Sequence, residues 1–266
     1  MSSDKRHWKQ LRRKLTHRER RLDWEQRHLI KDRTSERAVF EDVFDKSTLM
    51  TVYKLMNTGV IENLFGVVKT GKESRIYRGE TPQGDEVALK IYLTVSAEFR
   101  KNMLTYIQGD PRFTHIRRDS HRLIDLWAQK EFKNLKKAYE VGVKVPQPFT
   151  VEHNVLVMRF IGRDGVSAPL LREVELPHPA EVYRNLLNYV RVLYEKAELV
   201  HGDLSEFNVL MFEGEPWIID MSQSVVRTHP QAERFLLRDL TNLARFFNRL
   251  GVKTELPEAT LKTFLT

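Results

Sequence analysis

The spacing of hydrophobic positions changes from helical to alternating between residues 45 and 93. Residues 45–57 place apolar side chains on one helical face, with Asp45 or Ser47 as N-cap and Gly59 just past the end. Alternating apolar and polar positions then predict strands over residues 64–69, 74–79 and 86–93. A Pro-Gln-Gly-Asp turn separates the last two. We therefore predict a short helix followed by an antiparallel meander.

The rest of the chain mixes both spacings. Helical periodicity predicts three long helices, over residues 119–140, 179–198 and 230–250. Two prolines, Pro146 and Pro148, follow the first of them. Period two predicts strands over residues 149–151 and 155–160 and a second hairpin over 209–219 that turns at 213–216. Strands are therefore expected mainly before residue 161, and helices after it.

The first forty residues have a different character. They contain no Gly or Pro, and an apolar residue recurs every seventh position from Trp8 to Leu29, which predicts a thin stripe on a helix. Residues 1–37 hold thirteen Lys or Arg against six Asp or Glu and so carry +7 of the net charge of +8. This asymmetry favours an acidic partner such as nucleic acid, and a solvated charged helix is an equal alternative. The stripe could instead dock on the main domain or on a partner.

Composition excludes several classes of protein. No run of eighteen apolar residues is present, so we expect no membrane span. The charged N-terminus has no apolar core of a signal peptide, which argues against secretion. The absence of cysteine excludes disulfides and thiolate metal sites. We expect a cytoplasmic protein.

A polar motif between apolar flanks, residues 201–208, carries the chemistry. Asp203 precedes Asn208 by five residues, and His201 precedes Asp203 by two. In phosphoryl transfer, an Asp at this spacing can accept the proton of an attacking hydroxyl while the Asn holds a metal on the phosphates. Asp220 follows two isoleucines, at a predicted strand end. Asn208 and Asp220 can together offer oxygen ligands to Mg²⁺.

A lysine interrupts the apolar run of residues 87–92. Lys90 is costly to bury unless it is paired, and an edge-strand lysine pointing to solvent is the simpler alternative. The run also matches the kinase strand whose Lys contacts the phosphates of ATP, which favours function. Glu131, on the helix predicted over 119–140, is the best candidate for a carboxylate partner.

Residues 66–72 match the first seven positions of a Walker A loop, but Glu73 stands where Ser or Thr is required. Strand-like residues follow instead of a helix, so we reject the P-loop NTPase reading. A glycine-containing turn with Lys72 reaching inward can still cover nucleotide phosphates.

Six motifs in this order resemble the RIO family of atypical protein kinases, in its type-one branch. They are residues 70–73, 88–92, 127–131, 160–162, 201–208 and 219–225. The resemblance covers residues 42–250, and the short tail resembles compact archaeal members. Met221 and Ser222 replace the usual Phe-Gly after Asp220, and Ala-Pro-Glu is absent. Gly202, where the family more often has Ala, is expected to be of no consequence.

The resemblance implies a two-lobed α+β protein-kinase-like fold. Residues 41–161 would form an N-lobe of antiparallel sheet plus one helix, with a flexible insertion at 94–120. Residues 162–266 would form a reduced, mainly helical C-lobe without an activation loop or a peptide-docking subdomain. Residues 1–40 would be a basic extension, helical or partly disordered.

The resemblance also implies ATP with Mg²⁺, or Mn²⁺ as its substitute. Asp203, Lys90 and Asp220 would be catalytic, and Asp220 could itself carry a phosphate as well as bind metal with Asn208. The expected ATP contacts are Thr70, Lys72, Glu73, Lys90, Glu131, Met158, Arg159 and Ile161. The insertion offers four hydroxyls as candidates for autophosphorylation, Ser96, Thr105, Thr114 and Ser120, although a plain disordered loop is an equal alternative.

The expected biological setting is maturation of the small ribosomal subunit, with the basic extension contacting rRNA phosphates. The resemblance also suggests that ATP hydrolysis matters more there than phosphorylation of another protein. A small-molecule kinase of the aminoglycoside or choline type shares the central motif and stays an alternative. So does a scaffold that binds rRNA and uses ATP only as a structural ligand.

Overall fold

The computed structural model describes residues 44–93, 103–113 and 120–265. Its first helix, α3 (Lys46–Asn57), begins after Asp45, whose Oδ1 accepts a hydrogen bond from the Thr48 N–H at 2.8 Å. Gly59, with φ of +75°, follows the end of the helix. The helix and its Asp45 cap are therefore as predicted. The apolar stripe predicted over residues 1–40 lies outside the described residues.

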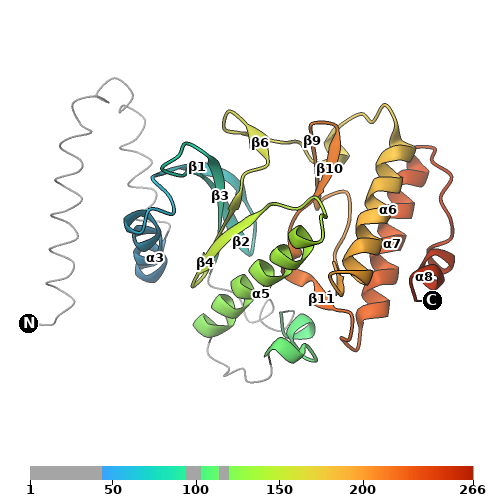
Figure 1. Cartoon of the computed structure of the whole chain (residues 1–266), viewed down its shortest axis with the longest axis horizontal. Coiled ribbons are helices and arrows are strands. Elements are labelled where there is room, and N and C mark those ends of the chain that lie inside the picture. The colour runs from blue at the N-terminus through green and yellow to red at the C-terminus, as the bar shows by residue number, and fades with distance from the viewer. Residues whose placement is uncertain (1–43, 94–102, 114–119, 266) are drawn as a thin grey trace, which may run out of the picture. The chain divides into compact units, whose positions relative to one another are not determined.

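Five antiparallel strands form the main sheet (Figure 1), and the predicted meander is its first part. Their order is β1 (Asn63–Thr70), β2 (Ser74–Glu80), β3 (Glu86–Tyr92), β5 (Val155–Arg159) and β4 (Pro148–Glu152). Strand β3 lies between β2 and β5, so both of its edges are paired, and its side chains from Val87 to Tyr92 are buried on both faces. Lys90 is therefore on a central strand, and the edge-strand alternative is wrong.

Helix α5 (Ser120–Glu140) lies across this sheet and contacts β4 and β5 (Figure 1). Part of the insertion packs against it. Residues 103–107 are helical, η1 (Pro111–Phe113) is a short 3-10 helix, and Met103, Ile107 and Phe113 share a buried cluster with Trp127. The middle part of the insertion, predicted to be flexible, is therefore packed against α5 in the structure. Residues 94–102 and 114–119 lie outside the described residues.

Three small two-stranded antiparallel sheets follow the main sheet, and two of them are hairpins. They comprise β6 (Gly162–Arg163) with β7 (Val166–Ser167), β8 (Leu199–Val200) with β11 (Val225–Val226), and β9 (Val209–Phe212) with β10 (Glu215–Ile218). The β9–β10 turn needs only Glu213 and Gly214, which both have positive φ, so it is tighter than predicted. Two 3-10 turns, η2 (Leu171–Glu173) and η3 (Met221–Gln223), complete this region.

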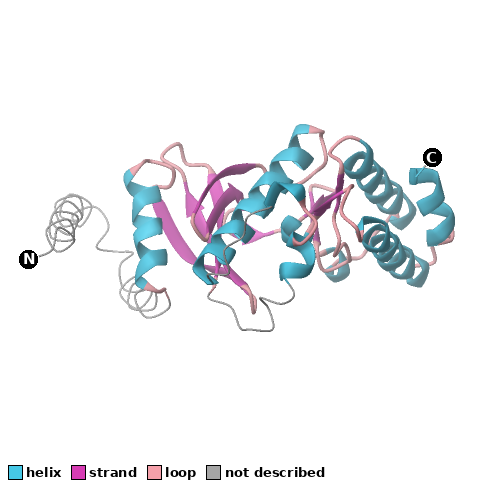
Figure 2. Ribbon diagram, turned by 90° about the horizontal axis from the view of Figure 1, so that it is seen from below, coloured by secondary structure: helices cyan, strands magenta, loops and turns pink. Residues whose placement is uncertain are grey.

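Three helices, α6 (Pro179–Glu195), α7 (Ala232–Arg249) and α8 (Pro257–Leu265), make up the C-terminal part (Figure 2). Leu186, Leu193, Leu240 and Phe247 are among the buried side chains of their shared core. Helix α8 was not predicted, and it adds Phe264 to that core. The described chain is thus α+β, as expected. None of its helices has the length and apolar character needed to cross a membrane.

Candidate active site

The loop of residues 201–208 runs from β8 to β9, and side chains of α7 hold its backbone by hydrogen bonds. Asp239 on α7 is buried and accepts two backbone N–H groups, from Gly202 at 2.7 Å and from Leu204 at 2.9 Å. Burial raises the pKa of Asp239 to about 7, against the effect of these two donors. Asn242, three residues further along α7, donates to the Leu204 carbonyl at 3.1 Å. The backbone on both sides of Asp203 is therefore fixed to one helix.

Gly202 has a conformational reason to be glycine. Its φ is +79°, and a Cβ at this position would lie 3.1 Å from the Gln223 carbonyl oxygen. A side chain here is strained whatever the space around it. Glycine in place of the family's commoner alanine, expected to be of no consequence, therefore relieves backbone strain at this position.

Asp203 faces polar partners on one of its two carboxylate oxygens. Its Oδ2 lies 3.3 Å from both Asn208 Nδ2 and Gln223 Nε2, and Asn208 also donates to the Asp203 carbonyl at 2.9 Å. Within the described part of the chain, the other carboxylate oxygen of Asp203, Oδ1, accepts no hydrogen bond. Burial raises the pKa of Asp203, which favours a base able to take a proton from a hydroxyl.

Three charged side chains meet at Lys90, far apart in sequence. Its Nζ lies 2.9 Å from Glu131 Oε1, 2.8 Å from Glu131 Oε2 and 2.8 Å from Asp220 Oδ1. Burial alone would lower the pKa of Lys90, but Asp220 and Glu131 outweigh burial and raise it. Burial raises the pKa of Glu131 to about 7, with Lys90 opposing. The predicted pair of Lys90 and Glu131 is present, and Asp220 joins it.

Asp220 stands at the end of the hairpin strand with left-handed backbone, at φ of +61°. Its Oδ1 accepts from both Lys90 and the Ser222 hydroxyl, the latter at 2.7 Å. Loss of hydration raises the pKa of Asp220, but Lys90 and Ser222 hold it below its usual range. Oδ2 has no hydrogen bond to the described residues, and the side chain is 43% exposed. An ionised oxygen is thus available to a cation.

Asn208 and Asp220 can hold a divalent cation together. The Ile219 N–H donates to the Asn208 carbonyl at 3.0 Å, which keeps the two residues adjacent. No cluster of three or more acidic or histidine side chains suited to a metal occurs in residues 44–93, 103–113 and 120–265. Two side-chain oxygens suit a Mg²⁺ ion that completes its shell with phosphates and water better than a metal bound by protein alone.

His201 is a structural member of this loop. It is 2% exposed, its Nε2–H donates to the Ile219 carbonyl at 3.2 Å, and its Nδ1 accepts from the Asp203 N–H at 3.3 Å. Burial lowers the pKa of His201 to about 4, so the ring is neutral near pH 7. It therefore connects the Asp203 loop with the strand end that carries Asp220.

The sequence reasoning missed a buried network that holds the segment after Asp220. Lys130 is fully buried on α5 and donates to the carbonyls of Ser222, at 2.8 Å, and Ser224. Asn134, one turn later, donates to the carbonyls of Met221 and Ser224 at 2.9 and 3.0 Å. Burial lowers the pKa of Lys130 strongly. Helix α5 therefore holds the segment after Asp220 through its backbone carbonyls.

The insertion extends this network. Arg112 donates from Nη1 to Asn134 Oδ1 at 2.9 Å, and its other nitrogens bind the carboxylate of Asp110, with the shortest contact at 2.7 Å. The insertion, α5 and the Asp220 segment are therefore joined by direct hydrogen bonds.

Comparison with known proteins agrees with this geometry. The model of the RIO domain matches residues 75–260, more than half of the chain. The chain belongs to the RIO family of serine/threonine-protein kinases. It is 41% identical over 217 residues to the Rio1 kinase of Haloferax volcanii, covering 82% of this chain and 74% of that protein. It is 40% identical over 227 residues to human RIO1, covering 84% of this chain and 40% of that one.

A solved structure shares the fold. The Rio2 kinase of Chaetomium thermophilum, in a complex described as ADP/Mg²⁺-phosphoaspartate, aligns with a TM-score of 0.60 at 27% identity, over 80% of this chain and 65% of that one. The kinase-like fold expected from the sequence is therefore present. The chain spans about three quarters of its archaeal relatives and less than half of the eukaryotic RIO1 proteins.

The remaining predicted ATP contacts of this RIO kinase vary in placement. Thr70 and Lys72 are exposed at the β1–β2 turn, and their contact with ATP stays a prediction. Glu73 is half-buried, and burial together with Asp220 raises its pKa. Glu73 therefore lies close enough to Asp220 and Lys90 to interact with both of their charges.

At the predicted hinge, strand pairing already uses two backbone groups. The Arg159 N–H donates to the Gln147 carbonyl at 2.8 Å, and the Ile161 carbonyl accepts from Ala168 at 3.0 Å. Met158 and Ile161 are buried and Arg159 is exposed. An adenine ring would therefore have to use the other backbone groups, the Arg159 carbonyl and the Ile161 N–H.

The four candidate autophosphorylation sites differ in whether the structure describes them and in where they lie. Ser96 and Thr114 lie outside the described residues, and Ser120 is the first residue of α5. Thr105 is exposed on the helical segment 103–107 and lines a cavity next to the site.

Proposed function

We propose that this chain is an ATP- and Mg²⁺-dependent serine/threonine kinase that phosphorylates its own insertion and also hydrolyses ATP during maturation of the small ribosomal subunit. The observation that carries the proposal is the meeting of Lys90, Glu131 and Asp220 at distances of 2.8–2.9 Å, beside the loop that holds Asp203. Kinases use this Lys–Glu pair and this Asp to place ATP and its metal.

Asn208 and Asp220 would hold the Mg²⁺, or a Mn²⁺ in its place. When bound, the ion neutralises charge on the phosphates as the bond to the leaving group breaks. Oδ2 of Asp220, which has no hydrogen bond to the described residues, fits this role. The related structure of a Rio2 kinase in an ADP/Mg²⁺-phosphoaspartate complex supports the proposal.

In the kinase reaction, Asp203 orients a serine or threonine hydroxyl and accepts its proton. The hydroxyl oxygen forms a bond to the γ-phosphorus, the bond between that phosphorus and the β–γ bridging oxygen breaks, and ADP leaves. Lys90 contacts the α- and β-phosphates and keeps them in place, while Glu131 keeps Lys90 in place. The raised pKa of Asp203 suits the proton transfer.

The ATPase reaction uses Asp220 as the acceptor. A carboxylate oxygen of Asp220 forms the bond to the γ-phosphorus, and the same β–γ bridge breaks. ADP leaves, and water then attacks the acyl phosphate, which releases inorganic phosphate and regenerates the carboxylate. The low pKa of Asp220 keeps the nucleophile ionised.

The proposed partner is the precursor of the small ribosomal subunit, in the cytoplasm. The basic residues 1–37 would bind rRNA phosphates, because that segment carries nearly all of the net positive charge.

The test is ATP hydrolysis by the full chain with and without purified small-subunit precursor particles. The proposal expects faster turnover with particles and autophosphorylation without them. Tight, salt-sensitive RNA binding without any turnover would favour the scaffold alternative. Rapid phosphorylation of a small alcohol in a substrate panel would favour a small-molecule kinase.

A further inference from the structure

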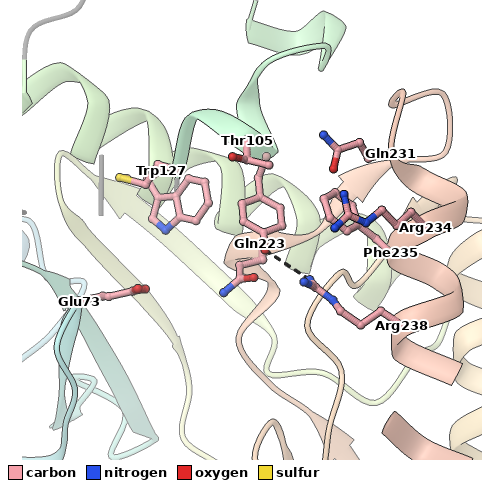
Figure 3. Close-up of a pocket in the computed structure, with 10 residues that line it drawn as sticks. Glu73, Thr105, Trp127, Gln223, Gln231, Arg234, Phe235 and Arg238 are labelled. Atoms are coloured by element: carbon pink, nitrogen blue, oxygen red, sulfur yellow. Dashed lines mark hydrogen bonds between the residues drawn. The ribbon is translucent and has the colours of Figure 1, made fainter. Parts of the chain in front are cut away.

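A cavity of about 340 Å³ lies beside Asp203, away from the predicted hinge. Figure 3 shows Glu73 and Trp127 on one side of it and Gln231, Arg234 and Arg238 on the other. Gln223 lines the cavity and donates to Asp203 at 3.3 Å, so a group in the cavity approaches the catalytic carboxylate past Gln223. The volume is that of a small ligand or a few side chains.

The floor of the cavity is aromatic and ordered. The rings of Tyr106 and Phe235 stack with centroids 5.1 Å apart, and Trp127 meets Tyr106 edge-on at 6.2 Å. The Tyr106 hydroxyl accepts a hydrogen bond from Arg238 at 3.3 Å. The insertion, through Tyr106, therefore forms one wall of a preformed site.

The two sides of the cavity have opposite charge. Glu73 faces Asp203 and Asp220 closely enough for both to raise its pKa. On the other side, Arg234 and Arg238 are four residues apart on α7 and so lie on one face of the helix. Both are exposed, and the arginine ion pairs within the described residues all involve other arginines. Within the described residues, neither guanidinium at the cavity mouth forms an ion pair with a carboxylate, although Arg238 opposes the effect of burial on the pKa of Asp203.

We propose that this cavity binds the acceptor polypeptide of the kinase reaction, and that Arg234 and Arg238 select acceptors whose serine or threonine has an anionic neighbour, a carboxylate or a phosphoserine. The proposal rests on the proposed kinase function. The acceptor hydroxyl lies at Asp203, and the anionic neighbour lies at the arginines. A guanidinium fork fits both carboxylate and phosphate, which share this chemistry.

The geometry favours a peptide over a polynucleotide. The occupant must present a hydroxyl side chain to Asp203, because serine/threonine transfer is the chemistry of this family. The cavity has room for a few side chains, and two arginines suit one or two anionic groups. A polynucleotide needs a longer run of basic residues, and such a run lies in residues 1–37 and not at the cavity.

The experiment compares serine peptides that are identical except for one flanking residue, which is Glu, phosphoserine, Gln or Lys. The full chain phosphorylates each, and kcat/KM is measured relative to the Gln peptide with the same enzyme. The expected preference is about tenfold for Glu over Gln, and Arg234→Gln should reduce it about threefold, as exposed charge pairs do. Arg234→Glu should favour the Lys peptide. Comparing the Glu and phosphoserine peptides distinguishes the two sources of negative charge.

Arg245→Gln is the matched control, because Arg245 is an exposed arginine on the same helix and does not line the cavity. This variant should keep the full preference. Equal rates on all four peptides would overturn the inference, as would absence of transfer to every peptide while autophosphorylation persists. Either result would leave the proposed function intact. That function fails separately if the wild type transfers phosphate to neither peptides nor itself and does not hydrolyse ATP.

The last measurement compares the binding of a short RNA by the wild type and by Arg234→Gln. If RNA binding falls with Arg234→Gln while peptide preference stays unchanged, the cavity is a nucleic-acid contact and the inference is wrong. If peptide preference falls and RNA binding does not, the inference holds.

Discussion

At the scale of single residues, the site depends on placing one cation between two anions. Lys90 is 4% exposed and Glu131 1% exposed, so each is costly to bury alone. Their mutual contact and the contact with Asp220 offset that cost. The same arrangement leaves one oxygen of Asp220 facing outward, where catalysis needs it.

Lys90→Met should reduce ATP turnover about a hundredfold, as loss of one preorganised charge commonly does. It also leaves Glu131 buried without its cation, so the free energy of unfolding should fall by about 3 kcal/mol. Turnover and urea denaturation measure the two effects. Lys54→Met is the control, because Lys54 is on the surface and 58% exposed. Unchanged turnover in Lys90→Met would remove Lys90 from the site.

His201 predicts a specific dependence of stability on pH. Its pKa is about 4 in the fold and 6.5 ordinarily, so between these values only the unfolded chain binds the proton. The wild type should therefore lose stability relative to His201→Gln by roughly 1.4 kcal/mol for each pH unit below 6.5. Glu131 and Asp239 titrate in both proteins and cancel in the difference. The free energy of unfolding of both proteins is measured by denaturation from pH 7 to 4.5. A difference between them that stays constant over this range would contradict a buried neutral ring.

At the scale of elements, local patterns predicted most of the strands and helices, and the reasons for the exceptions are physical. Helix α8 is short and has only Thr260 and Phe264 buried, so its sequence carries a weak periodic signal. The packed part of the insertion depends on Trp127 and Tyr92, which are distant in sequence. Tertiary contacts of this kind have no local pattern to predict them.

Within the site, motifs identified the residues that would touch ATP but not those that hold them. A signal existed for two of the supporting residues. Asp239 lies four residues from both Phe235 and Leu243, and Lys130 lies three from Trp127, so each is a polar residue on an apolar helical face. Gln223 and Arg238 gave no such signal, because their roles follow from the approach of α7 to the segment after Asp220.

Lys130→Met should loosen the segment that follows Asp220. Two carbonyls lose their buried donor, which should lower the free energy of unfolding by about 1–3 kcal/mol. The Mg²⁺ concentration for half-maximal activity should rise, because Asp220 is less well oriented. Kinase assays over a Mg²⁺ series measure this effect. Lys136→Met, an exposed lysine on the same helix, should change neither quantity. A stability loss with an unchanged Mg²⁺ requirement would reduce Lys130 to a purely structural role.

At the scale of the whole molecule, charge and catalysis belong to different parts of the chain. The proposed chemistry lies in residues 73–239, whereas residues 1–37 carry +7 of the net charge of +8. We expect the first part to carry out phosphoryl transfer and the second to determine where it happens.

Removing residues 1–37 should weaken binding to rRNA and flatten its dependence on salt, because fewer counterions are released. Plots of log affinity against log salt concentration for the full and shortened chains measure this. Autophosphorylation of the shortened chain is the control for folding. Equal slopes would place the RNA contact elsewhere.

The central claim is that Asp203 acts as the base of a phosphoryl-transfer site built by Lys90 and Asp220. The most direct measurement is autophosphorylation of Asp203→Asn from ATP labelled in its γ-phosphate, together with ATP binding by calorimetry. We predict that transfer to serine or threonine falls at least about a hundredfold, while ATP affinity changes little. Full autophosphorylation in this variant would contradict the account.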